Sequence, residues 1–160
     1  MKPILRILAL TLLAGQLTAA TVILVRHADR AGGMTGDVPL NERGKQRAES
    51  LSRLLADAGV SEIYVTDVQR TQQTAAPLAA RLNLTPIVLP GANVNELVDR
   101  LKKLGPEKTV LVVGHSNTVP QIVEGMGGAV PAISETEFNR MLIVTTGGGK
   151  PGVVTLRYGD

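Results

Sequence analysis

Two short apolar segments of this chain each end directly in a histidine, and they constrain the fold more than any other feature. Residues 21–30 read TVILVRHADR, and residues 109–117 read TVLVVGHSN. Each begins with a run of branched aliphatic residues that has the length of a buried β-strand. In open α/β sheets, ligands bind at the carboxyl ends of the strands. The sequence therefore predicts that His27 and His115, the two histidines of the chain, lie at one edge of a sheet.

The rest of the chain alternates between strand and helix patterns. We expect further strands at 62–66, 86–89, 141–146 and 153–158, and helices at 41–58, from 67 or 68 to 82, from 93 or 95 to 104, and from about 120 to 126. This alternation predicts an α/β fold, a three-layer α/β/α sandwich around a mostly parallel sheet with an antiparallel edge strand. On the first helix, Gly44, Lys45 and Arg47 are expected to be solvated surface positions.

Composition excludes several classes of function. The 160 residues suit one domain with an aliphatic core, because 44% are hydrophobic and only 2% are aromatic. So few aromatic rings argue against binding of single-stranded nucleic acid. The chain has no cysteine, which rules out a cysteine nucleophile, and no cluster has the spacing of a metal site. We expect no metal, no cofactor and no nucleic-acid partner, while the oligomeric state stays open.

Residues 1–20 have the layout of a secretory signal peptide. A basic start is followed by an apolar core from Ile7 to Leu13 and by the small residues Ala19 and Ala20. The apolar core is too short to remain as a membrane span. We therefore expect cleavage near Ala20, a mature domain over residues 21–160, and a periplasmic or secreted protein. The alternative is a buried N-terminal helix.

Two segments of the sequence resemble a known family. RHADR, residues 26–30, is similar to the RHG-type signature of the histidine phosphatase superfamily, with Ala28 in place of the glycine. TDVQRTQQTA resembles the family's second segment, in which a strand-end Ser or Thr precedes an arginine and a Thr/Ala-rich helix. Thr66 and Arg70 occupy those two positions. The resemblance covers essentially all of residues 21–160 and implies a phosphoglycerate mutase-like fold.

The basic residues near the two histidines predict an anion pocket. Arg70 is expected in the first turn of a helix, where an arginine and free backbone N–H groups together form a phosphate site. Guanidinium groups from Arg26, Arg70 and Arg30 would match a phosphoryl group well. Their positive charge also lowers the pKa of a neighbouring imidazole, which keeps that imidazole neutral and nucleophilic.

The resemblance implies a role for each of these residues. It implies that His27 is the nucleophile that becomes phosphohistidine, and that Arg26, Arg70 and His115 bind the phosphoryl group. His115 is also expected to stabilise the transition state as a hydrogen-bond donor.

The proton donor is the one departure from the family pattern. In the branch that carries RHGxR, which Arg30 fits, an acid directly follows the second histidine, but this chain has Ser116 there. In the other branch a glutamate from the middle of the chain serves, and Glu96 is the nearest candidate by order. An exposed carboxylate in the first turn of a helix is an equally good interpretation of Glu96. Three further carboxylates stay open as the acid: Asp29, Asp67 and Glu42.

We expect a phosphomonoesterase that acts through a phosphohistidine intermediate on small phosphorylated molecules or phosphoprotein. The alternatives are a phosphoryl mutase of the same superfamily and a protein that binds phosphate or a phosphorylated ligand without turnover. A serine hydrolase is disfavoured although GHSNT resembles a nucleophile elbow. Thr118 stands where that motif needs its second glycine, and no histidine follows the serine.

Overall fold

The computed structural model describes residues 19–32, 36–147 and 149–159. The predicted signal peptide therefore lies outside the described residues, apart from its last two positions. The carbonyl oxygen of Ala19 accepts a hydrogen bond from the Glu107 amide at 3.0 Å, and that of Ala20 accepts one from the Thr146 amide at 2.9 Å. Within the described residues, no helix is long and apolar enough to cross a bilayer.

One six-stranded sheet forms the centre of the fold, with strands in the order β3-β2-β4-β1-β5-β6. Strands β1 to β4 are parallel, β5 pairs antiparallel with β1, and β6 pairs antiparallel with β5. In chain order the elements are β1 (Thr21–Arg26), α1 (Glu42–Leu54), β2 (Val60–Thr66), α2 (Gln69–Leu82), β3 (Ile87–Leu89), α3 (Val94–Lys102), β4 (Thr109–Gly114), α4 (Thr118–Gly125), β5 (Arg140–Thr145) and β6 (Gly152–Arg157). The α/β fold and its antiparallel edge are confirmed.

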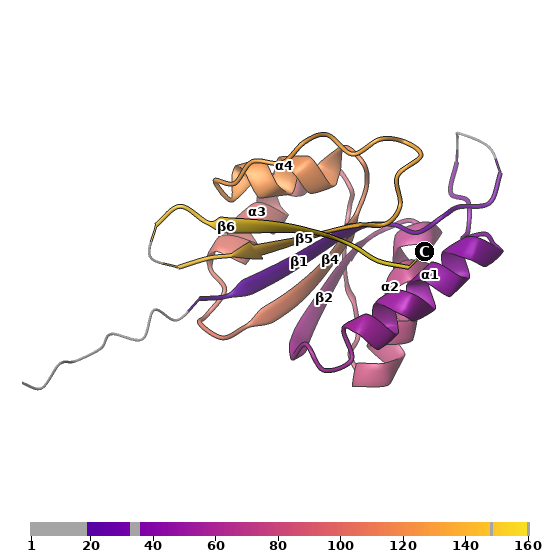
Figure 1. Cartoon of the computed structure of the whole chain (residues 1–160), viewed down its shortest axis with the longest axis horizontal. Helices are drawn as coiled ribbons and strands as arrows, with labels where there is room; N and C mark the ends of the chain where they lie inside the picture. Colours follow the sequence, from indigo (N-terminus) through magenta and orange to yellow (C-terminus); the bar gives the residue numbers. More distant parts are fainter. Residues whose placement is uncertain (1–18, 33–35, 148, 160) are drawn as a thin grey trace, which may run out of the picture.

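Helices cover both faces of this sheet, as a three-layer sandwich requires (Figure 1). On one face, Ile23 and Val25 of β1 join an apolar cluster with α1 and α2. On the other face, Val22 and Leu24 join a cluster with α3 and α4. Because side chains alternate along a strand, a strand buried on both faces has to be apolar throughout. Burial on both faces therefore explains why the aliphatic runs of β1 and β4 are unbroken.

The pairing of β1 with β4 brings the two histidine segments together. Thr21 lies opposite Thr109, and the register continues residue by residue to Arg26 opposite Gly114. The amide of His27 then donates to the carbonyl of Gly114 at 2.9 Å. The near-identical strands therefore deliver His27 and His115 to the same point at the carboxyl edge of the sheet.

The expectation of a solvated surface on the first helix is wrong for Gly44 and Arg47, while Lys45 is exposed. A Cβ on Gly44 would lie 2.0 Å from the carbonyl oxygen of Asp29, so α1 presses directly on the segment that follows β1. The Arg47 side chain is only 3% exposed, and its Nε donates to Asp29 Oδ2 at 2.7 Å. Both residues face inward because α1 packs against this segment.

Candidate active site

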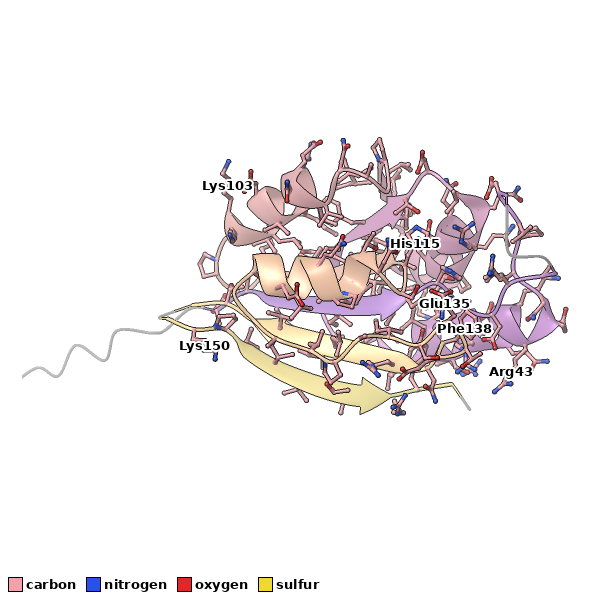
Figure 2. The ribbon with its side chains drawn as sticks, turned by 90° about the horizontal axis from the view of Figure 1, so that it is seen from above. Arg43, Lys103, His115, Glu135, Phe138 and Lys150 are labelled. Atoms are coloured by element: carbon pink, nitrogen blue, oxygen red, sulfur yellow. The ribbon has the colours of Figure 1, made fainter. Side chains whose placement is uncertain are left out.

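An open pocket of about 630 Å³ lies at the carboxyl ends of β1 and β4. Figure 2 shows His115, Glu135 and Phe138 gathered at this end of the sheet. The lining contains the five residues that the sequence predicted for a phosphate site: Arg26, His27, Arg30, Arg70 and His115. It also contains Gly91, Ala92, Ser116, Asn117, Thr118 and Glu135.

His27 is held as a neutral imidazole with one nitrogen free to react. Its Nδ1 lies 2.9 Å from the carbonyl oxygen of Ala28. A carbonyl only accepts, so Nδ1 carries the proton and Nε2 carries the lone pair. Burial, reinforced by Arg26, His115 and Arg70, lowers the pKa of His27 to about 3, although the bond to Ala28 acts in the opposite direction. The imidazole is therefore unprotonated and nucleophilic at neutral pH.

His115 faces His27 across the pocket. The two ring centroids are 5.4 Å apart, with the rings edge to face. His115 Nε2 lies 3.1 Å from Thr66 Oγ1, at the end of β2. Burial, followed by the charges of Arg70 and Arg26, lowers the pKa of His115 to about 4. The second imidazole is thus also neutral, and Thr66 orients it.

Helix α2 contributes Arg70 to the pocket and supports the backbone next to His27. Arg70 lies in its first turn, and one of its terminal nitrogens donates to the Gly36 carbonyl at 3.4 Å. Thr74, one turn later, accepts from the amide of Ala28 at 2.9 Å and so fixes the backbone next to His27. Within the described part of the chain, the Nε atoms of Arg26 and Arg70 are buried without an acceptor. Buried donors are normally satisfied, so these two favour an anionic ligand in the pocket.

Arg26 also anchors a loop that the sequence analysis did not connect with the site. Its Nη1 donates to the carbonyls of Ser134 at 2.8 Å and Glu137 at 3.1 Å. The guanidinium lies 4.2 Å from the centre of the Phe138 ring, a distance typical of a cation–π contact. We call residues 134–138 the clamp loop. No local signal marks it, because its contacts depend on a residue more than a hundred positions away.

The structure does not bring the predicted proton donor Glu96 into the pocket. The Glu96 carboxylate is paired with Arg100 at 2.9 Å on α3 and is not among the lining residues. The three other candidates are also absent from the lining. Asp29 pairs with Arg47 and Glu42 pairs with Lys45, away from the pocket. Asp67 lies at the edge of the pocket, where it accepts from the amide of the lining residue Gly91.

The carboxylate in the lining is that of Glu135, from the clamp loop. No pattern in the sequence marks this residue as part of the site. Glu135 lies 19 positions after Ser116 in a loop without helix or strand, so only the tertiary structure brings it to the pocket. Among the described residues, no group of three His, Cys, Asp or Glu side chains is arranged to hold a metal ion.

A sequence profile described as the histidine phosphatase superfamily (branch 1) matches residues 22–93, which include His27 and Arg70. The fold is similar to that of the protein histidine phosphatase SixA in complex with tungstate, with a TM-score of 0.68, 21% identity, and coverage of 88% of this chain and 96% of SixA. It is also similar to a phosphoglycerate mutase of Plasmodium falciparum, with a TM-score of 0.59, 21% identity, and coverage of 89% and 91%. Residues 22–93 are thus similar to the histidine phosphatase superfamily, and the fold of the described residues is similar to that of its members.

Two mycobacterial proteins are similar to parts of the sequence. PE-PGRS family protein PE_PGRS11 of Mycobacterium tuberculosis is 33% identical over 103 residues, which are 62% of this chain and 17% of that protein. An 8-oxo-(d)GTP phosphatase of Mycolicibacterium smegmatis is 40% identical over 68 residues, which are 39% of this chain and 21% of that protein. The matched stretches thus span about a fifth of the length of these relatives.

Proposed function

We propose that this chain is a histidine-dependent phosphatase that hydrolyses phosphate monoesters through a phosphohistidine intermediate. The observation that carries the proposal is the content of one pocket: two neutral imidazoles, and two arginines whose buried Nε atoms have no acceptor among the described residues. A dianionic phosphoryl group supplies acceptors to those arginines and an electrophilic phosphorus to His27. The match of residues 22–93 to the histidine phosphatase superfamily supports the same chemistry.

The reaction proceeds in two transfers. The lone pair on Nε2 of His27 forms a bond to phosphorus, while the bond from phosphorus to the leaving oxygen breaks and its electrons leave with that oxygen. Nδ1 keeps its proton and donates to Ala28, which stabilises the positive charge that develops on the ring. Arg26, Arg70 and Arg30 balance the negative charge on the transferring group. Water then attacks phosphorus and releases phosphate and neutral His27.

The substrate is a small phosphorylated molecule or a phosphoprotein. An open pocket of about 630 Å³ admits a phosphoryl group carried on either kind of molecule. The similar proteins include one described as a protein histidine phosphatase and one described as an 8-oxo-(d)GTP phosphatase. A screen should therefore contain sugar and aryl phosphates, a phosphohistidine peptide and a nucleoside triphosphate.

Turnover on this panel, with trapping of acid-labile phosphoenzyme, tests the proposal. The change His27→Ala should abolish the label and lower turnover by roughly 10⁴-fold or more, as expected for loss of a covalent nucleophile. Arg70→Ala should cost about 10²–10³-fold, the scale for loss of one preorganised charged donor. Transfer of the phosphoryl group within the substrate instead of to water would identify a mutase. Binding of phosphate without turnover would identify a binding protein, and label that persists in His27→Ala would contradict the assigned nucleophile.

We also propose that the chain is exported, with cleavage of a signal peptide near Ala20. The support is the pattern of residues 1–20 in the sequence. Sequencing the N-terminus of the protein from its native host tests this, and an intact Met1 on cytoplasmic protein would refute it. The same measurement distinguishes cleavage directly after Ala20 from cleavage further upstream, which would keep the two carbonyl acceptors of Ala19 and Ala20 in the fold.

A further inference from the structure

The Glu135 carboxylate is fixed in the pocket by two contacts from different elements. Its Oε1 accepts a hydrogen bond from Ser116 Oγ at 2.5 Å, and its Oε2 lies 3.1 Å from Nη2 of Arg26. Ser116 directly follows His115, and Arg26 directly precedes His27. Glu135 is therefore tied to the neighbours of both histidines, although it belongs to the clamp loop.

The backbone around Glu135 is held as firmly as its side chain. Arg26 bonds the carbonyls of Ser134 and Glu137, on either side of Glu135, and stacks on Phe138. The Phe138 ring in turn lies 5.9 Å from the ring of His27, centroid to centroid. This arrangement fixes the carboxylate in the pocket that His27 also lines, while the Glu135 side chain stays 62% exposed to water.

The surroundings of Glu135 favour its ionised form. The hydrogen bond from Ser116, together with the charges of Arg26 and Arg30, lowers the pKa of this carboxyl below its ordinary value, although partial burial acts in the opposite direction. An ionised carboxylate accepts a proton and cannot donate one. In a pocket that it shares with a buried histidine, and open to water, such a group suits the activation of a water molecule better than the protonation of a leaving group.

We propose that Glu135 is the general base of the second transfer, in which water hydrolyses phosphorylated His27. The water oxygen forms a bond to phosphorus and gives one proton to the Glu135 carboxylate. The bond from phosphorus to Nε2 breaks, and its electron pair returns to the imidazole. Glu135 then releases the proton to solvent. The assignment rests on the proposed phosphatase activity and adds the residue that completes its cycle.

The two transfers should depend on Glu135 to different extents. The first transfer receives no help from an ionised carboxylate, so its rate should fall steeply as the pKa of the leaving alcohol rises. The second transfer depends on Glu135 for every substrate, because all substrates give the same phosphoenzyme. Removal of the carboxylate should therefore slow hydrolysis of the phosphoenzyme and leave its formation nearly unchanged.

Rapid-quench kinetics with 4-nitrophenyl phosphate tests this on the full chain. Glu135→Gln keeps the size of the side chain and one oxygen that can accept from Ser116 or Arg26, but it removes the base. We expect a burst of nitrophenol at the wild-type rate, followed by steady-state turnover about 10²–10³-fold slower, within the range for loss of general base catalysis. Acid-labile phosphohistidine should accumulate during the slow phase. Glu49→Gln, at an exposed position on α1, is the matched control and should behave as wild type.

Rescue experiments check that the carboxylate itself is required. Turnover by Glu135→Ala should rise in proportion to added formate, and Glu135→Asp should recover part of the wild-type rate. Three results overturn the proposal: wild-type turnover in Glu135→Gln, equal loss of burst and steady state, and an increase in kcat/KM. The second result would mean that Glu135 only positions the clamp loop, and the third that it only competes with phosphate. A wild-type protein that forms no phosphoenzyme would instead refute the proposed function.

Discussion

His27 is buried and His115 is half-buried, both lie near Arg26 and Arg70, and these surroundings set their protonation. Burial and the nearby positive charges lower the two pKa values to about 3 and about 4. Both imidazoles should therefore stay neutral from pH 7 down to pH 5 in the ligand-free protein. Because the chain has only these two histidines, ¹⁵N chemical shifts of the imidazoles measure this directly. The variant His27→Gln assigns the two sets of signals, and titration of either ring near pH 6.5 would contradict the expectation.

The same lowered pKa values determine the direction of a stability effect. In the unfolded chain a histidine takes up a proton near its ordinary pKa of about 6.5. Between that value and the lower folded pKa, the unfolded chain binds more protons than the folded one, so the free energy of unfolding falls as the pH falls through this window. With respect to these two imidazoles, the free energy of unfolding is highest above pH 6.5 and decreases as the pH falls toward 3.

Among the secondary-structure elements, α1 supports the site without contributing to the pocket lining. Gly44 allows the helix backbone to approach Asp29, whose carbonyl also accepts from the Asn41 amide at 3.0 Å. Helix propensity alone would make Gly44→Ala stabilising by about 1 kcal/mol. A Cβ placed 2.0 Å from a backbone oxygen reverses that sign, because neither backbone can yield without moving the segment after His27.

Gly44→Ala should therefore lower the free energy of unfolding by roughly 1–3 kcal/mol, the usual cost of overpacking. We also expect phosphatase activity to fall, since the displaced segment carries His27. Urea unfolding and turnover of an aryl phosphate measure the two effects. Gly105→Ala is the control, because a Cβ there meets no atom within 4 Å. Equal stability of the two variants would show that α1 does not constrain the active-site segment.

For the molecule as a whole, Arg47 joins three distant parts of the chain. Its Nε donates to Asp29, after β1, and its Nη1 donates to the carbonyls of Tyr158 and Gly159, after β6. The side chain is 3% exposed. The end of β6 is thereby fastened to α1 and to the segment after β1 that carries His27 and Asp29.

Arg47→Met should destabilise the protein by about 3–5 kcal/mol, because it leaves the Asp29 carboxylate buried without its main partner. Arg43→Met is the matched control. Arg43 also faces Asp29, at 3.5 Å, but is 71% exposed, and exposed pairs contribute only about 0–1 kcal/mol. Chemical unfolding of both variants at pH 7 makes the comparison. A loss of less than 1 kcal/mol in Arg47→Met would mean that the buried pair does not hold the end of β6.

The sequence by itself determined the sheet and the position of the two histidines. Short uninterrupted runs rich in β-branched residues favour strands buried on both faces, and residues that follow parallel strands meet at one edge. His27, His115, Arg26 and Arg70 were predictable for this reason, since each follows or ends a strand or begins a helix that comes after one. Local pattern and the rules of strand order suffice for such residues.

Only the tertiary structure decided which carboxylate enters the pocket and which residues brace it. Glu135 reaches Ser116 across 19 positions, and Arg47 reaches Tyr158 across 111. Neither contact leaves a periodic pattern, because each depends on how a loop or a helix face packs after the sheet has formed. Glu96 fits the expected chain order but pairs with Arg100 on the surface of α3. Order along the chain does not fix distance in space once loops carry the functional groups.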